Sequence, residues 1–202
     1  MNRVWFDVGA HIGAYSLPPA RANSLLRVYA FEPHLRVAMR LAAYAVGLSN
    51  YTVLPLAVGE NDGVASFHLS DCDDGCSSLL PFNPKGVKQW SEIVPTLLKT
   101  VEVVTVPVIR LDSFMDLAGI QKVDYLKVDA QGSDLAVVRS AGARLRDIAR
   151  ITLEVQISTV PLYSGGSEKC ATVEFLLQSG FRLESCVRQT FDLEENLTFC
   201  RI

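Results

Sequence analysis

The amino-acid sequence predicts an α/β fold with a doubly wound, mostly parallel β-sheet. Short apolar segments typical of buried strands alternate with segments that carry apolar residues at helical spacing. The expected strands of this kind lie at residues 4–8, 28–31, 51–58, 123–129 and 151–155. The last two β-rich segments, residues 181–187 and 197–202, are separated by too few residues for a helical crossover. They therefore predict an antiparallel hairpin at one edge of the sheet.

The first half of the chain predicts one short helix and one longer helix. Pro18 and Pro19 follow soon after the first strand, and proline disrupts a helix beyond its first turn, so we expect a short or irregular helix there. Residues 35–46 carry apolar side chains at helical spacing, and Gly47 follows them as a C-terminal stop. These two helices would connect the first three strands.

Residues 64–70 interrupt this alternation of strand and helix. Apolar positions such as Phe67 and Leu69 alternate with polar ones, which predicts a half-exposed strand. Residues 101–109 form a second β-rich segment that can pair with it, and the segment 71–100 between them is longer than most loops of a compact domain. We interpret the whole as an inserted β-hairpin with a loop on the substrate side.

The second half of the chain returns to strands joined by helices. Residues 111–118 predict a short helix that Gly119 ends, and Ser133 is placed to cap the helix after the strand at residues 123–129. Residues 172–178 predict the last helix. Helical connections of this kind join parallel strands of one sheet.

Length and composition favour one globular domain spanning residues 1–202. The chain is 49% hydrophobic and 20% charged, which is typical of a folded protein with a single core. The net charge of −3 and the lack of a Lys/Arg run argue against a nucleic-acid partner. No segment has the length and apolarity of a membrane span. The first strand begins so near Met1 that we expect neither a targeting segment nor an N-terminal substrate cap.

The use of cysteine predicts a reducing, cytoplasmic setting. The five cysteines are odd in number and scattered, unlike a disulfide framework. Cys72 and Cys76 lie close together in an acidic stretch, but no second pair of cysteines or histidines completes four metal ligands. We therefore expect no metal, and we interpret this stretch as a polar loop with two free thiols.

The turn after the first strand has the pattern of a nucleotide-type cofactor loop. Gly9 and Gly13 lack a Cβ atom and let a ligand approach the backbone, and Asp7 ends the strand beside them. A dinucleotide loop has Gly-x-Gly-x-x-Gly with an acid about 20 residues later. Here the spacing is Gly9-x-x-x-Gly13, and the acid is Glu32 at the end of the second strand. His11 lies between the glycines, and histidine is among the residues that tolerate a positive φ.

Short motifs follow one another in order from residue 4 to about residue 155. They are Asp7-Val8-Gly9-Ala10-His11-Ile12-Gly13, Phe31-Glu32-Pro33, Leu56-Ala57-Val58-Gly59 with Gly63, Cys76-Ser77-Ser78-Leu79, Arg110-Leu111-Asp112-Ser113 and Leu126-Lys127-Val128-Asp129-Ala130-Gln131-Gly132-Ser133-Asp134. Each motif is weak alone, but the ordered set resembles the FkbM family of S-adenosylmethionine-dependent methyltransferases. The sequence departs from the family's usual Asn, Val and Glu at His11, Ala130 and Asp134.

The resemblance implies a Rossmann-like, class I methyltransferase fold with S-adenosyl-L-methionine as its cofactor. It also implies O-methylation of a hydroxyl group on a sugar or another small molecule. In such a site Glu32 would bind both ribose hydroxyls, Asp7 would hold the methionine end, and residues 57–58 would line the adenine pocket. The expected cofactor-binding residues are Asp7, Gly9, Ala10, His11, Gly13, Glu32, Pro33, Ala57, Val58 and Ser78, with Ser77 as a further candidate.

Structural roles remain open for several of these residues. Gly9 and Gly13 would also suit a plain tight turn, and Asp7 would also suit a helix cap. Residues 57–58 would serve equally well as ordinary core positions.

Asp129 is the strongest candidate for catalysis. It ends the strand at residues 123–129, at the carboxyl edge where open α/β sheets bind ligands. A hydroxyl acceptor is a poor nucleophile, so a base within hydrogen-bond reach would assist methyl transfer. Asp129 would be that base, or it would bind the amino group of the cofactor. Glu154 and His68 are second candidates for the base.

Two other functional classes fit parts of the pattern. A dehydrogenase of similar topology is disfavoured by the missing third glycine and by the position of Asp7. A non-catalytic cofactor-binding module of the same fold fits His11 and the expected lack of an N-terminal cap. Titration with S-adenosylhomocysteine and with NAD would separate these classes.

Overall fold

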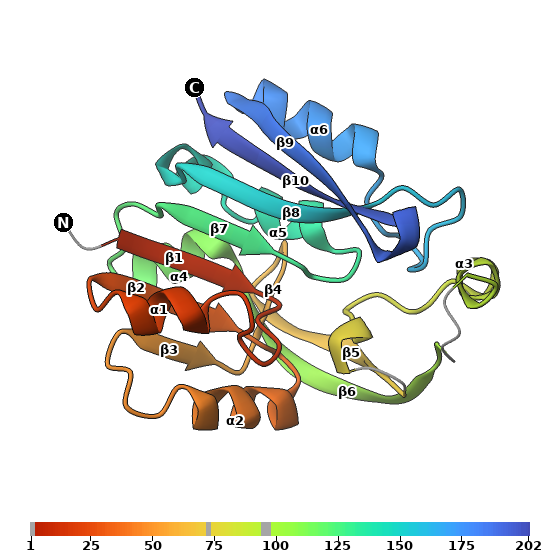
Figure 1. The fold of residues 1–202 in the computed structure, drawn as a ribbon, viewed down its shortest axis with the longest axis horizontal. Coiled ribbons are helices and arrows are strands. Elements are labelled where there is room, and N and C mark those ends of the chain that lie inside the picture. The colour runs from red at the N-terminus through yellow and green to blue at the C-terminus, as the bar shows by residue number, and fades with distance from the viewer. Residues whose placement is uncertain (1–2, 72–73, 94–97) are drawn as a thin grey trace.

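A seven-stranded sheet with the order β3-β2-β1-β7-β8-β10-β9 forms the centre of the molecule (Figure 1). The computed structural model describes residues 3–71, 74–93 and 98–202. The strands of the main sheet are β1 (Arg3–Val8), β2 (Leu26–Phe31), β3 (Tyr51–Leu54), β7 (Tyr125–Val128), β8 (Arg150–Gln156), β9 (Phe181–Gln189) and β10 (Glu194–Arg201). Neighbouring strands are parallel except for β10, which is antiparallel to both β8 and β9. The predicted mostly parallel sheet with an edge hairpin is therefore confirmed.

Helices cover the main sheet from both sides, because side chains alternate between the two faces along each strand. The helices are α1 (Leu17–Ala22), α2 (Leu35–Tyr44), α4 (Leu111–Leu117), α5 (Asp134–Arg139) and α6 (Lys169–Gln178). On β1, Phe6 and Val8 belong to the core shared with α4, α5 and α6. Trp5 packs against the second core, to which α1 and α2 contribute. The alternation on β1 leaves Asp7 on the same face as Trp5.

The first helix is short, as the prolines predict. Pro18 and Pro19 both lie in the first turn of α1, where a missing N–H costs no hydrogen bond. The chain leaves the helix at Asn23, which is already extended. A short α1 keeps the preceding turn close to the ends of the neighbouring strands.

A smaller three-stranded sheet contains the predicted insertion. Its order is β4-β6-β5, formed by β4 (Ala57–Val58), β5 (Gly63–Ser70) and β6 (Thr100–Ile109). The antiparallel pairing of β5 with β6 confirms the predicted hairpin. The prediction of one strand at residues 51–58 is wrong, because this segment divides into β3 of the main sheet and β4 of the small sheet. Pro55 lies at the break, where its missing N–H cannot continue a strand ladder.

The segment between β5 and β6 contains a helix that the sequence pattern did not indicate. This helix, α3 (Pro84–Ser91), begins after Asn83, whose side chain accepts a hydrogen bond from the Lys85 N–H. Trp90 of α3 packs in a cluster with Tyr163, which lies in the segment after β8. A 3₁₀ turn, η1 (Asp74–Cys76), precedes the helix. Cys72, the partner of Cys76 in the sequence motif, lies outside the described residues.

The turn after β7 is held by a carboxylate. Ser133 occupies the predicted N-cap position of α5, but its side chain makes no capping hydrogen bond. Instead, the buried Asp134 carboxylate accepts hydrogen bonds from the N–H groups of Ala130 and Gly132, each at 3.2 Å. These bonds fix the turn that carries Gln131, the residue between them. A 3₁₀ helix, η2 (Gly142–Asp147), follows α5.

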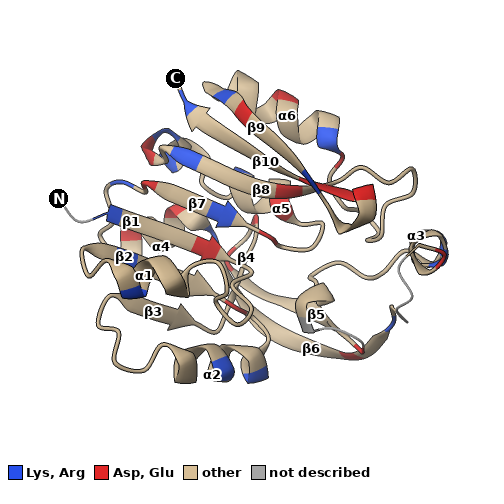
Figure 2. Cartoon of the chain, in the orientation of Figure 1, with Lys and Arg blue, Asp and Glu red and all other residues tan. Residues whose placement is uncertain are grey.

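Acidic residues gather at the carboxyl edge of the parallel strands. Figure 2 shows acidic segments near the ends of β1 and β8 and at the start of β10. They correspond to Asp7, Glu154 and the neighbouring pair Glu194 and Glu195. The fold thus collects carboxylates at the edge where α/β sheets bind ligands.

Candidate functional site

A cavity lies at the carboxyl edge of β1, β2 and β7, beside the small sheet. The space between its lining atoms amounts to about 680 Å³, including the part that is open to solvent. Its apolar lining residues are Val8, Phe31, Pro33, Leu56, Ala57, Val58, Phe67, Leu79 and Ala130. Its polar and backbone lining comes from Gly9, His11, Glu32, Ser77, Asp129 and Gln131. This lining suits a ligand with a flat apolar ring and several polar groups.

Gly9 is required where the cofactor loop passes the end of β7. Its φ is +70°, and a Cβ atom at this position would lie 1.9 Å from the backbone oxygen of Asp129. Its N–H donates to the Phe31 carbonyl at 3.0 Å, which ties the loop to β2. Any side chain at Gly9 would therefore push β1 away from β7.

Glu32 connects the cofactor loop with the end of β2. Its two carboxylate oxygens accept hydrogen bonds from the N–H groups of His11 and His34, each at 2.8 Å. His11 reaches this position with a φ of 48°, in the left-handed region that the sequence pattern allowed. Burial raises the pKa of Glu32 to about 7, although both N–H donors oppose the shift. A carboxyl group of this kind changes its charge near neutral pH.

A largely buried lysine lies between two carboxylates beside the Gly9 loop. The Lys127 Nζ atom is 3.2 Å from the Asp129 carboxylate and 3.6 Å from that of Asp7, and it donates to the Gly9 carbonyl at 3.2 Å. Burial lowers the pKa of Lys127, but the attraction of Asp129 and Asp7 outweighs it and leaves the pKa above its ordinary value. The lysine is therefore charged and holds the ends of β1 and β7 together.

Asp7 is almost completely buried beneath the loop. One of its carboxylate oxygens, Oδ2, accepts a hydrogen bond from the Ser16 hydroxyl at 2.5 Å. The other, Oδ1, has no hydrogen-bond partner and faces Lys127 at 3.6 Å. An unsatisfied buried carboxylate oxygen is a place where a cationic group is favoured.

Asp129 presents its carboxylate to the cavity from the end of β7. Lys127 donates to Oδ2 at 3.2 Å, and the side-chain amide of Gln131 donates to Oδ1 at 2.7 Å. The Asp129 side chain remains 34% exposed, so its oxygens can still accept a hydrogen bond from a ligand.

Glu154 lies behind this carboxylate at the end of β8. Its Oε2 atom is 3.4 Å from the Gln131 amide nitrogen. Burial, together with repulsion from Asp129 and Glu194, raises the pKa of Glu154 to about 10. Glu154 is therefore protonated at neutral pH and cannot accept a further proton there.

The comparison with protein families decides the class of this site. The profile described as the Methyltransferase FkbM domain matches residues 7–183, which include the loop, Glu32 and Asp129. The chain belongs to the FkbM methyltransferase family. The cofactor of this family is S-adenosylmethionine. A curated relative, the AMB antimetabolite synthetase AmbE of Pseudomonas aeruginosa, is 28% identical over 96% of this chain, which spans only 10% of that protein.

Solved structures show that this FkbM domain has the Rossmann-like class I methyltransferase fold. A SAM-dependent methyltransferase from Aquifex aeolicus has a TM-score of 0.50 and 12% identity, covering 100% of this chain and 83% of that one. Aeropyrum pernix fibrillarin has a TM-score of 0.56 and 14% identity, covering 98% of this chain and 66% of that one. Precorrin-6y C5,15-methyltransferase from Geobacter metallireducens has a TM-score of 0.52 and 14% identity, covering 100% and 80%.

Most of the residues expected from the sequence line one cavity of the FkbM domain. They are Gly9, His11, Glu32, Pro33, Ala57, Val58, Ser77 and Asp129. Asp7 does not line the cavity; it lies beneath the loop, where its Oδ1 atom is 3.6 Å from Lys127. Ala10 packs in the core beneath α1, and a Cβ atom at Gly13 would meet Leu17 and Leu41. Ala10 and Gly13 pack within the loop and do not line the cavity.

Ser78 and His68 belong to the inserted segment. The Ser78 hydroxyl donates to the Gln131 carbonyl at 2.7 Å and accepts from the Leu80 N–H. The main chain of His68 pairs with that of Ser78. Neither residue lines the cavity. Ser78 instead fastens the inserted segment to the turn after β7.

Sequence reasoning missed Lys127 and Gln131 as site residues. A usable signal was present, because Lys127 lies two positions before Asp129 on one strand and therefore on the same face of the sheet. Phe67 and Leu79 of the insertion, by contrast, reach the cavity only through tertiary packing.

No helix in the described part of the chain is long and apolar enough to span a membrane.

Proposed function

We propose that this FkbM domain transfers a methyl group from S-adenosylmethionine to a hydroxyl oxygen of a small molecule or sugar, with Asp129 as the general base. The observation that carries the proposal is that one cavity brings together the Gly9 loop, the carboxylate of Glu32 and the carboxylate of Asp129. A cofactor cradle and a base within the same cavity are what methyl transfer to a hydroxyl requires.

The lining residues fit the proposed cofactor. The apolar residues Ala57 and Val58 offer a slot for a purine ring, and each Glu32 oxygen, already bonded to one N–H, keeps a lone pair for a ribose hydroxyl. Gly9 allows close approach to the backbone. The negative charge of Asp7 beneath the loop would favour the cationic methionine end of the cofactor nearby.

Asp129 is better suited to the base role than Glu154 or His68. When bound, the cofactor supplies an electrophilic methyl group on a positively charged sulfur. As the acceptor oxygen bonds to that carbon and the carbon–sulfur bond breaks, the hydroxyl proton needs an acceptor within reach. Asp129 is half-buried and lines the cavity. The raised pKa of Glu154 leaves that residue protonated, and His68 does not line the cavity.

The experiment compares the wild-type protein with Asp129→Asn. Both proteins are incubated with S-adenosylmethionine and a panel of methyl glycosides and small alcohols, and methylated product is measured by mass spectrometry. We expect product only with the wild type, while calorimetry shows that both bind S-adenosylhomocysteine. Full turnover in Asp129→Asn would exclude the base role. Cofactor binding without product from any acceptor would favour the non-catalytic module.

A further inference from the structure

Gln131 occupies a strained position at the end of β7. Its φ is +51°, in the left-handed region that is unfavourable for a residue with a side chain. The turn is nevertheless fixed from several directions. The Asp134 carboxylate holds the flanking N–H groups, and the Ser78 hydroxyl donates to the Gln131 carbonyl at 2.7 Å. Strain that the surroundings hold in place is typical of residues with a functional task.

The side chain of Gln131 connects Asp129 with Tyr163. Its Nε2 atom donates to Asp129 Oδ1 at 2.7 Å, and its Oε1 atom accepts from the Tyr163 hydroxyl at 2.8 Å. The carboxylate can only accept, so the amide must turn its nitrogen toward Asp129. The tyrosine hydroxyl then satisfies the amide oxygen. These two partners together determine the orientation of the amide.

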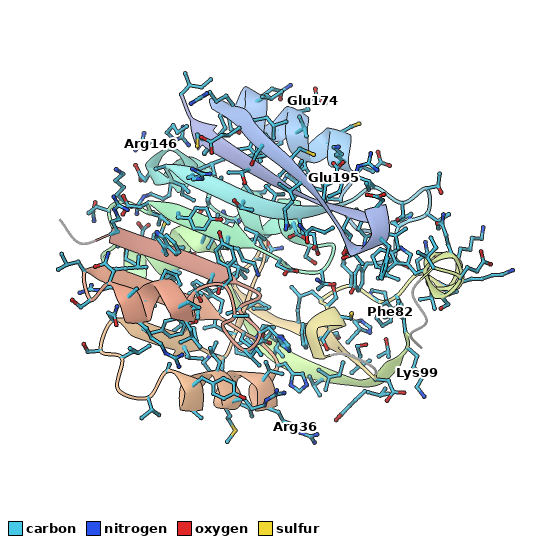
Figure 3. All side chains as sticks on the ribbon, in the orientation of Figure 1. Arg36, Phe82, Lys99, Arg146, Glu174 and Glu195 are labelled. Carbon is cyan, nitrogen blue, oxygen red and sulfur yellow. The ribbon has the colours of Figure 1, made fainter. Side chains whose placement is uncertain are left out.

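Tyr163 is itself held firmly. The residue is only 1% exposed, and its ring stacks on Phe82 with 5.2 Å between ring centroids. Gly132 faces the same ring, and a Cβ atom there would lie 3.0 to 3.2 Å from it. The Tyr163 hydroxyl is also 2.9 Å from the Cys76 carbonyl. Figure 3 shows Phe82 in the segment that leads toward α3, so the inserted segment supports the tyrosine.

We propose that Gln131, held by Tyr163, is a positioning residue that fixes the carboxylate of Asp129 for its task in methyl transfer. This inference rests on the proposed base role of Asp129. With Lys127 bonded to Oδ2 and Gln131 bonded to Oδ1, the plane of the carboxylate is set from both sides. The remaining lone pairs are then available to a ligand in the cavity.

Through these contacts the inserted segment affects the orientation of the Asp129 carboxylate. The Ser78 hydroxyl of the insertion donates to the Gln131 carbonyl. The Tyr163 hydroxyl, from the segment after β8, shares its single proton between the Gln131 amide oxygen and the Cys76 carbonyl of the insertion. Without the Gln131 amide, Lys127 alone would hold the carboxylate and would draw it toward Gly9. A misplacement of about 1 Å at a reacting group costs about 100-fold in rate.

The test uses Tyr163→Phe and Gln131→Ala in the full chain. Tyr163→Phe removes only the hydroxyl and keeps the ring on Gly132. Tyr29→Phe is the matched control, because the Tyr29 ring packs against Phe6 and Phe114 in the core. The measurements are S-adenosylhomocysteine affinity by calorimetry, the side-chain amide resonances of Gln131 by ¹⁵N NMR, and kcat and KM where an acceptor is turned over.

We expect the Gln131 amide resonances to move toward those of a free amide in Tyr163→Phe and to stay unchanged in the Tyr29 control. S-adenosylhomocysteine affinity should stay within about twofold of the wild type, whereas kcat falls about 10- to 100-fold in Tyr163→Phe. The double variant with Gln131→Ala should be no slower than Gln131→Ala alone, because both changes remove one connection.

Two outcomes would overturn the inference. The first is a Gln131 amide signal that does not respond to Tyr163→Phe, which can be observed without any acceptor. The second is wild-type kcat in Gln131→Ala when Asp129→Asn is inactive. If Asp129→Asn keeps full turnover, the proposed function fails instead, even where the amide signal responds as expected.

Discussion

Replacing Glu32 by glutamine tests the cofactor cradle most directly. The substitution keeps the shape of the side chain but removes its charge and exchanges one acceptor oxygen for an amide donor. In the folded protein both carboxylate oxygens already accept from backbone N–H groups, those of His11 and His34. Each oxygen can serve only one further ribose hydroxyl, so Glu32→Gln loses at least one ligand hydrogen bond.

The expected loss follows from the charge on that bond. A hydrogen bond to a charged group contributes about 1.5 to 3 kcal/mol, so the affinity for S-adenosylhomocysteine should fall about 10- to 150-fold. Stability should change much less, because removing the buried charge of Glu32 relieves its desolvation, which offsets the loss of the hydrogen bond from the N–H of His11 or His34. Glu60→Gln is the control, since Glu60 is an exposed glutamate paired only loosely with Arg139 at 3.9 Å.

Titration calorimetry at several pH values gives a second test of whether the ionised Glu32 carboxylate binds the ribose. Burial raises the pKa of Glu32 to about 7, and only the ionised form offers all its lone pairs to ribose hydroxyls. Wild-type affinity should therefore fall as the pH drops through about 7, and Glu32→Gln should lack this dependence. An affinity within twofold of the wild type in Glu32→Gln would refute the assignment of Glu32 to the cofactor site.

Two further predictions concern the loop and the buried acids. Gly9→Ala combines a left-handed φ with a Cβ atom 1.9 Å from the Asp129 carbonyl, so it should abolish S-adenosylhomocysteine binding and lower Tm. Gly165→Ala, with a φ of +83° and open space around it, should cost only the backbone strain of about 1 kcal/mol, and equal effects in both variants would contradict the clash. Because the pKa of Glu154 is raised, the folded protein binds more protons than the unfolded chain, and Tm should fall as pH rises from about 6 to about 8. Glu154→Gln should raise Tm at pH 8 and flatten this slope, and a steeper slope would contradict the buried, protonated state.

Much of the main sheet could be predicted from local pattern alone. Each parallel strand is a short apolar run followed by a turn residue, and each crossover helix has its own apolar spacing. The small sheet and the insertion were harder to predict. Pro55 separates β3 from β4, whose sequences together resemble one strand, and α3 is a short, polar helix. What stabilises α3 is the burial of Trp90 in a cluster with Leu162 and Tyr163, residues far from it in the chain.

The site was predictable where the backbone itself makes the contact. Gly9 and Glu32 are recognisable because a tight turn and a strand end impose residue types on fixed positions of the sequence. Gln131 was not recognisable as a site residue, since its importance comes from Tyr163 and Ser78, which approach it from distant segments. Lys127 could have been recognised, because the two-residue period of a strand places it on the same face as Asp129.

The balance of charge explains why this loop suits a sulfonium cofactor better than a dinucleotide. Asp7 and Asp129 flank Lys127, so the three groups together carry one negative charge when all are ionised. A pyrophosphate approaching the Gly9 turn would meet that negative charge, whereas a cation is attracted to it. Lys127 also donates to the Gly9 carbonyl, so the charged lysine is used within the protein and is not offered to a phosphate. We therefore expect the three residues that join β1 to β7 to favour a cationic ligand group over an anionic one at this loop.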